Sequence, residues 1–234
     1  MLDQNLRDVF LECGCQVLDQ LLPRIVLLPS NREAISRLIK IASSRTLHIC
    51  ATGTGQSFPV NYQPKENQIF LLTTQMNQLL ELKHLDASVV VESGILTSKL
   101  AERLEGTQLD FPEVLSKYSG TMAGAVLGPD TQGLRHAELR RRILGVEIID
   151  PKGRLLKFGS HAIKNVAGYD YWSFLVGTRG RFGIATRFIL NLERMPLLDT
   201  VPHPGKRSDS LDNPSEWIYA NLCKRLDPDG IFVQ

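Results

Sequence analysis

Three glycine-containing clusters are the parts of this sequence most suited to binding chemistry. The first is Thr52-Gly53-Thr54-Gly55-Gln56-Ser57, the second is Ser119-Gly120-Thr121-Met122-Ala123-Gly124, and the third runs from Gly177 to Ile184. Glycine permits positive φ and lets the backbone approach a ligand closely, and successive N–H groups can form an anion-binding concavity. The third cluster has glycines at three-residue spacing, which favours backbone wrapped around a flat or extended ligand.

The first cluster has a plainer alternative. A short loop of Gly, Thr and Ser is more often a turn than a binding site, and this one lacks the six-residue G-x-G-x-x-G pattern of dinucleotide-binding folds. Its position favours a ligand, because the apolar segment 46–51 directly before it predicts a strand. Ligands of open α/β sheets lie at the carboxyl ends of parallel strands.

The residues before this strand predict a strand–helix–strand unit. The run Ile25–Leu28 predicts a buried strand, and Ser30 with Glu33 forms a capping box at the start of a helix. The apolar residues of this helix share one stripe: Ile35, Leu38, Ile39 and Ala42. Together with the strand at 46–51, this unit predicts a parallel pair of strands.

Further elements are predicted on both sides of this unit. Helical spacing covers 6–22 and 95–104, and Gly106 is a suitable stop for the second of these helices. Strands are predicted at 69–72, 88–92 and 184–192. A β-hairpin is predicted from Val146 to Phe158 around the turn Asp150-Pro151-Lys152-Gly153.

Composition excludes several classes of protein. The 234 residues carry 27 basic and 25 acidic side chains, a balance that does not indicate a nucleic-acid binder or a membrane-surface protein. No apolar stretch reaches the ~20 residues of a spanning helix. Four cysteines without a CxxC pair favour a reducing cytoplasm. The histidines show no metal-like spacing with neighbouring acids, so we predict no metal site, and His48 is predicted to be structural.

Beyond these physical arguments, the clusters and their order resemble a known family. The most specific residues are Phe158-Gly159, then Lys164-Asn165-Val166-Ala167-Gly168-Tyr169-Asp170, then Gly177 to Ile184. They are similar to the FAD-binding domain of the p-cresol methylhydroxylase and vanillyl-alcohol oxidase type. Within that family they most resemble the FAD-binding subunit of bacterial glycolate oxidase. The similarity covers residues 25 to 192.

The resemblance implies an α+β fold, a two-lobed FAD-binding domain with a short C-terminal helical tail. Residues 1–85 would form an N-terminal α/β lobe, and residues 86–195 a second α+β lobe. Residues 196–234 would form a Pro-rich linker and a helix, with Asn213 as its N-cap and Pro214 at its first position. The cofactor FAD would lie between the two lobes.

The resemblance also assigns residues to the cofactor. Thr52, Gly53, Thr54, Gly55, Gln56 and Ser57 match the first pyrophosphate loop, and Ser119, Gly120, Thr121 and Gly124 match the second phosphate segment. Lys164, Asn165, Gly168 and Tyr169 would lie near the flavin, and Gly183 and Ile184 near the adenine. Many relatives link FAD covalently through a His in the first loop. Gln56 stands in this loop and the second segment has no Cys, so non-covalent binding is expected.

Two departures from the family limit the resemblance. An Arg-Asp pair typically precedes the segment Leu144-Gly145-Val146, and here Arg141 replaces the acid. The run Arg140-Arg141-Arg142 is predicted to be a solvated or subunit-facing patch rather than a phosphate contact. Relatives also continue into a substrate-capping domain, for which residues 195–234 are too few.

Two classes of function follow. The first is a cytoplasmic FAD-binding subunit of an oxidoreductase that acts on a 2-hydroxy acid such as glycolate. Its partner would be a second flavoprotein or an iron–sulfur subunit, with no nucleic acid and no membrane span. The alternative is a non-catalytic subunit that keeps the fold in order to bind a partner. The retained glycine clusters favour the first class, and the missing cap favours the second.

Overall fold

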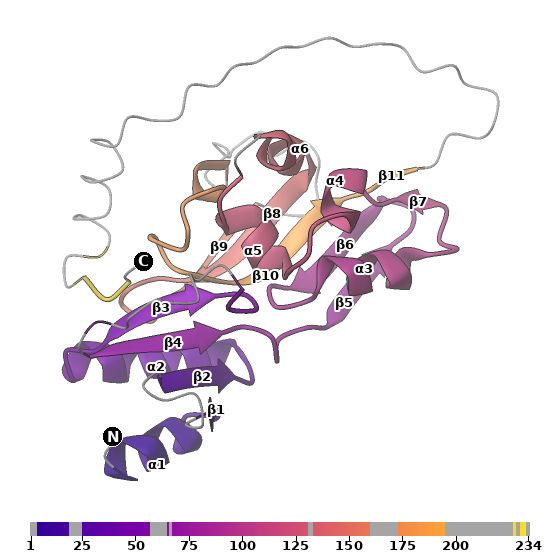
Figure 1. Cartoon of the computed structure of the whole chain (residues 1–234). Coiled ribbons are helices and arrows are strands. Elements are labelled where there is room, and N and C mark those ends of the chain that lie inside the picture. Colours follow the sequence, from indigo (N-terminus) through magenta and orange to yellow (C-terminus); the bar gives the residue numbers. More distant parts are fainter. Residues whose placement is uncertain are drawn as a thin grey trace, which may run out of the picture.

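The computed structural model describes residues 4–18, 25–56, 65, 67–130, 133–159, 173–194, 227 and 230–232. These residues form two principal sheets that lie next to each other, each with helices against it (Figure 1). The predicted linker and C-terminal helix fall almost entirely outside the described residues, and the predicted domain boundaries remain predictions.

The first sheet has four strands in the order β1-β2-β4-β3. Their bounds are β1 (Cys15–Leu18), β2 (Ile25–Pro29), β3 (His48–Thr52) and β4 (Gln68–Leu72). Strands β2 and β3 are parallel, as predicted, but they are not neighbours, because β4 pairs in parallel with both of them. Helix α2 (Arg32–Ser44) buries its predicted apolar stripe against one face of this sheet.

The start of helix α2 differs from the prediction by one residue. Asn31, rather than Ser30, is the N-cap, and its side chain accepts a hydrogen bond from the Ala34 N–H at 2.8 Å. Glu33 pairs with the Arg32 guanidinium instead of closing a capping box. Asn and Ser are equally good N-caps, so the sequence alone does not select between these adjacent residues.

The N-terminal helix is shorter than predicted. Helix α1 covers Gln4–Glu12, and the predicted continuation to residue 22 is wrong, because Cys15–Leu18 form strand β1. Gly14 has φ +86°, a conformation that ends the helix. Strand β1 then pairs antiparallel with β2, and both Cys15 and Val17 are buried.

The second sheet is antiparallel, with five strands in the order β5-β6-β10-β8-β9. The strands are β5 (Leu79–Lys83), β6 (Ser88–Glu92), β8 (Ile143–Ile149), β9 (Leu155–Gly159) and β10 (Ile184–Asn191). The predicted hairpin is confirmed as β8–β9, and the Asp150 carboxylate accepts bonds from the Lys152 and Arg154 N–H groups within its turn. A separate two-stranded ladder joins β7 (Leu109–Asp110) to β11 (Glu193–Arg194).

Four helices cover one face of the second sheet (Figure 1). They are α3 (Thr97–Leu104), α4 (Glu113–Ser116), α5 (Met122–Leu127) and α6 (Leu134–Arg142), and a 3₁₀ turn follows at Ser173–Leu175. The predicted solvation of the arginine run is wrong for Arg142, which is buried and pairs with Glu138 at 2.7 Å. Arg141 remains exposed.

The C-terminal residues return to the first sheet. The Ile49 N–H donates to the Ile231 carbonyl at 2.6 Å, and Phe232 forms a parallel bridge with Ile49. The Nδ1–H of His48 donates to the Gly230 carbonyl at 2.9 Å, a structural role as predicted. Asp227 accepts the N–H groups of Ile231 and Phe232, so this short segment covers the outer edge of β3.

Candidate cofactor-binding site

The first two glycine clusters meet directly, although 60 to 70 residues separate them in the sequence. A Cβ on Gly53 would lie 2.1 Å from the Thr121 Oγ1, so the Thr121 side chain occupies the space that any side chain at position 53 would need. Thr121 is almost completely buried at this contact. The first loop follows β3 of the first sheet, and the second segment begins helix α5, which packs on the second sheet, so the contact joins the two halves of the fold.

The first loop presents free backbone beside this contact. Gly55 has φ +81°, and a Cβ built on it would meet nothing within 4 Å. Within the described ranges, the N–H groups of Thr54, Gly55 and Gln56 donate to no other residue. The loop is half-buried up to Gly55 and exposed at Gln56. Unbonded N–H groups beside open space at the carboxyl end of β3 suit an anionic group.

The second segment is held in place by its backbone. Thr121 is the N-cap of helix α5, and its Oγ1 accepts the Gly124 N–H at 3.1 Å. The Met122 and Ala123 N–H groups donate to the carbonyls of Ile95 and Ser93, both at 2.8 Å. The Thr97 N–H donates to the Gly120 carbonyl at 3.0 Å. Segment 93–97 therefore positions the second cluster.

Segment 93–97 and its partner at 73–76 were not predicted as part of the site. A Cβ on Gly94 would lie 1.7 Å from the Thr73 carbonyl oxygen, so the two backbones touch where the chain passes from the first sheet to the second. Among the described residues, the buried hydroxyls of Thr73 and Ser93 have no hydrogen-bond partner. The available signal was a single glycine, Gly94, two positions after the end of strand β6.

Behind the second segment lies an aromatic ring that sequence reasoning also missed. Tyr118 packs against the backbone of Gly120 and Gly124, where added Cβ atoms would lie 2.7 and 2.8 Å from the ring edge and the hydroxyl oxygen. The Arg135 guanidinium carbon lies 4.4 Å from the centre of this ring. Burial raises the pKa of Tyr118 despite the nearby Arg135 charge, which keeps the phenol neutral.

The third cluster supports the end of helix α5 rather than forming a loop beside the first two clusters. The Gly177 and Arg179 N–H groups donate to the carbonyls of Val126 and Leu127 at the end of α5. Gly183 and Ile184 are buried at the start of β10, where Ile184 pairs with Ile149. Among the described residues, no backbone hydrogen bond joins Gly183 or Ile184 to the first two clusters, and a Cβ on Gly183 would meet Ile149 and Ile148. Ser57, Lys164, Asn165, Gly168 and Tyr169 lie outside the described residues.

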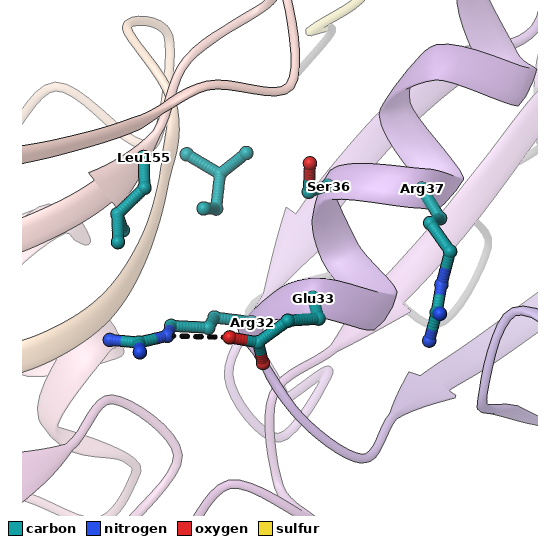
Figure 2. Close-up of a pocket in the computed structure, with 6 residues that line it drawn as sticks. Arg32, Glu33, Ser36, Arg37 and Leu155 are labelled. Carbon is teal, nitrogen blue, oxygen red and sulfur yellow. Dashed lines mark hydrogen bonds and ion pairs between the residues drawn. The ribbon is translucent and has the colours of Figure 1, made fainter.

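A cavity of about 260 Å³ lies elsewhere, between α2 and the β8–β9 hairpin (Figure 2). Its polar groups already bind one another: Arg32 pairs with Glu33 and Glu147, and the Ser36 hydroxyl donates to the Gly153 carbonyl. Figure 2 shows Arg37 on the far side of the helix from Leu155, and it donates to the Cys13 carbonyl. These side chains are therefore not available to hold a cofactor.

The fold and the paired glycine segments define an FAD-binding domain of the p-cresol methylhydroxylase type. Residues 23–159, more than half of the chain, match the family described as FAD binding domain, and the chain belongs to this family. The match contains the first loop, the second segment and the hairpin. The family match confirms the resemblance to this family, and the fold confirms the mixed helix and sheet architecture, whereas the assignment of single residues to FAD stays a prediction.

Curated relatives include FAD-linked oxidoreductases. Glycolate oxidase subunit GlcD of Bacillus subtilis (strain 168) is 29% identical over 180 residues, which are 76% of this chain and 38% of that protein. D-2-hydroxyglutarate dehydrogenase of Stutzerimonas stutzeri (strain A1501) is 23% identical over 177 residues, 74% of this chain and 38% of that protein. The chain therefore spans little more than a third of the length of these relatives.

Solved structures agree on the fold. A structure of alkyldihydroxyacetonephosphate synthase superposes with a TM-score of 0.58 at 21% identity, covering 74% of this chain and 32% of that one. At this identity the likeness shows the fold alone. In the part of the chain that the structure describes, no helix is long and apolar enough to cross a membrane.

The described residues fit the pyrophosphate of FAD. The first loop offers unbonded N–H groups and a glycine with open space, and the second segment touches it through Gly53 and Thr121. Within the same described ranges, no group of three His, Cys, Asp or Glu side chains could hold a metal ion. The flavin end of the site would involve residues 164–170, which the structure does not describe.

Proposed function

We propose that this chain binds FAD non-covalently and is the FAD-binding part of an oxidoreductase that acts on a 2-hydroxy acid. The observation that carries the proposal is the direct contact of Gly53 with Thr121, which joins two glycine segments beside unbonded backbone N–H groups. Bound FAD would supply the hydride-accepting ring, and the protein would supply binding and orientation. The names of the glycolate and hydroxyglutarate relatives support the substrate class.

Non-covalent attachment rests on the chemistry of the first loop. Gln56 is exposed at its end, and an amide side chain is not a nucleophile that attacks the flavin. We expect acid denaturation followed by centrifugation to leave all flavin absorbance in the supernatant. Colour in the pellet would contradict non-covalent binding. A colourless protein that cannot be reconstituted with FAD would contradict binding itself.

We further propose that the substrate site needs residues beyond these 234. A small acid is normally bound in a closed pocket with convergent polar groups, and this chain spans about a third of the length of its relatives. We also propose that a second flavoprotein or an iron–sulfur subunit is the partner that receives the electrons. The buried free thiols of Cys13, Cys15 and Cys50 support a reducing, cytoplasmic location.

Anaerobic mixing with substrate tests whether these residues alone form a substrate site. We expect the FAD-loaded 234-residue chain to show no rapid bleaching of the flavin absorbance with glycolate or D-lactate. Rapid, saturable bleaching by the chain alone would show that it forms a complete site. No finding favours the alternative of a non-catalytic partner-binding subunit, because the matching family and the curated relatives are FAD proteins.

A further inference from the structure

The second phosphate segment rests on the ring of Tyr118. The ring edge and the hydroxyl fill the positions that side chains at Gly120 and Gly124 would occupy, so the backbone of both glycines lies flush against the aromatic side chain. The Tyr118 carbonyl also accepts the Thr97 hydroxyl at 2.6 Å. Thr97 thus fixes the backbone of residue 118, and the Tyr118 ring sets where the backbone of the second segment lies.

Arg135 completes this support from helix α6. Its guanidinium lies over the Tyr118 ring at 4.4 Å, while its Nε donates to the Ala125 carbonyl at 2.9 Å and its Nη2 to the Pro129 carbonyl. The planar guanidinium fork therefore links the ring, helix α5 and the loop after α5. Lysine has no such fork, so it could not make these contacts together.

The positive charge of Arg135 is a second reason to connect this residue with the binding of FAD. Neither residues 52–56 nor residues 119–124 include Lys, Arg or His, although the pyrophosphate of FAD carries two negative charges. Arg135 is half-buried and pairs with no carboxylate among the described residues, since both of its hydrogen bonds are donated to neutral carbonyls. Its positive charge is therefore not neutralised by an ion pair.

We infer that Tyr118 and Arg135 are positioning residues for the pyrophosphate of FAD: the ring sets the backbone shape of the second segment, and the guanidinium provides its positive potential. This inference rests on the proposed function. It concerns residues that act through the backbone of Gly120 and Gly124, without contact to the flavin ring.

The test uses four variants of the full chain: Tyr118→Leu, Tyr118→Phe, Arg135→Met and Arg135→Lys. FAD affinity is measured by flavin fluorescence at several salt concentrations, ADP is the flavin-free competitor, and thermal unfolding monitors the fold. We expect Tyr118→Leu and Arg135→Met to weaken FAD and ADP by the same factor, roughly tenfold. Arg135→Met should also flatten the salt dependence of FAD binding, because that dependence reports charge.

The conservative variants separate positioning from general stability. Tyr118→Phe keeps the ring and should bind FAD nearly as wild type does, and Arg135→Lys should keep the salt dependence while losing affinity. An unchanged salt dependence in Arg135→Met, or an ADP affinity unaffected in either truncated variant, would overturn the inference while wild-type FAD binding stands. Failure of the wild-type chain to bind FAD would overturn the proposed function, and this inference with it.

Discussion

Two of the junctions between the first and the second sheet are built in opposite ways. At the glycine junction, backbone meets backbone or a small side chain, at Gly53 against Thr121 and at Gly94 against Thr73. At the charged junction, between α2 and the β8–β9 hairpin, Glu147 binds Arg32 at 3.0 Å and Lys157 at 2.9 Å. Arg187 approaches the same carboxylate at 3.8 Å.

This difference distinguishes a junction that can bind a ligand from one that only holds the two sheets together. At the charged junction the polar side chains pair with one another, so the cavity beside them offers little to a ligand (Figure 2). At the glycine junction, Gly53 and Gly94 let the two sheets come close together, and the N–H groups of residues 54–56 have no hydrogen-bond partner among the described residues. We therefore expect the cofactor to bind at the glycine junction. The cavity beside the charged side chains belongs to a structural contact between α2 and the β8–β9 hairpin.

The largest effect is expected at Gly53. A Cβ in Gly53→Ala would clash with the buried Thr121 Oγ1, so we expect the free energy of unfolding to fall by about 2–3 kcal/mol. We expect FAD binding to be lost as well. Urea unfolding measures the loss of stability. The double variant Gly53→Ala/Thr121→Ala removes the clashing oxygen and should recover part of it. Wild-type stability in Gly53→Ala would mean that the glycine junction is not close-packed.

Gly55 and Gly124 should separate ligand contact from protein packing. Gly55→Val meets no neighbour, so it should cost about 1–2 kcal/mol of stability through strain at positive φ and should weaken FAD binding further by blocking the loop. Gly55→Asn is the control, since Asn tolerates this conformation. Calorimetric FAD titration and thermal unfolding measure the two effects.

The resemblance assigns Gly124 to the phosphate segment, and the structure adds a packing role for this glycine. A side chain there meets the Tyr118 hydroxyl at 2.8 Å, so Gly124→Val should reduce stability and FAD affinity together. The same two measurements apply. If Gly124→Val loses cofactor with an unchanged melting temperature, the glycine faces the ligand rather than Tyr118.

The smallest effect is expected at the charged junction. Burial raises the pKa of Glu147, but Lys157, Arg187 and Arg32 outweigh it and hold the pKa below its ordinary value of 4.5. The ion pairs therefore stabilise the fold above that pH, and this stability is lost as the pH falls through the lowered pKa. Glu147→Gln should cost about 1 kcal/mol at neutral pH without changing FAD affinity.

Melting temperatures of wild type and Glu147→Gln across pH 3 to 8 check this point. The difference between the two proteins should be constant above the ordinary carboxyl pKa and should shrink below it. A loss of FAD binding in Glu147→Gln would make the charged junction part of the site and would remove the distinction between the two junctions.

The sequence predicted what depends on local periodicity. The stripe of α2 from Ile35 to Ala42 and the turn at Asp150 are defined by residues a few positions apart, and both are present in the structure. The N-terminal helix was overextended because Cys13 and Val17 suit a helix stripe, whereas Gly14 and pairing with β2 decide the outcome. Pairing with a distant strand leaves no local trace.

The first two glycine segments were located from the sequence, but their mutual contact was not. Gly53 and Thr121 look ordinary in isolation, and only the approach of the two sheets makes them partners. Gly94 and Tyr118 were missed for the same reason, since a single glycine after a strand and a tyrosine near a loop are common features. Their importance comes from the backbone that they touch.

The return of the C-terminal segment to β3 has a consequence for synthesis of the chain. His48 and its partner Gly230 are 182 positions apart, so ribosomes that add about 5–20 residues per second make the two segments roughly 9–36 seconds apart. During that interval the outer edge of β3, including the Ile49 N–H, has no strand beside it. An open edge can pair with another nascent chain. The edge of β3 therefore stays open to such pairing until Ile231 and Phe232 have been synthesised and bind to Ile49.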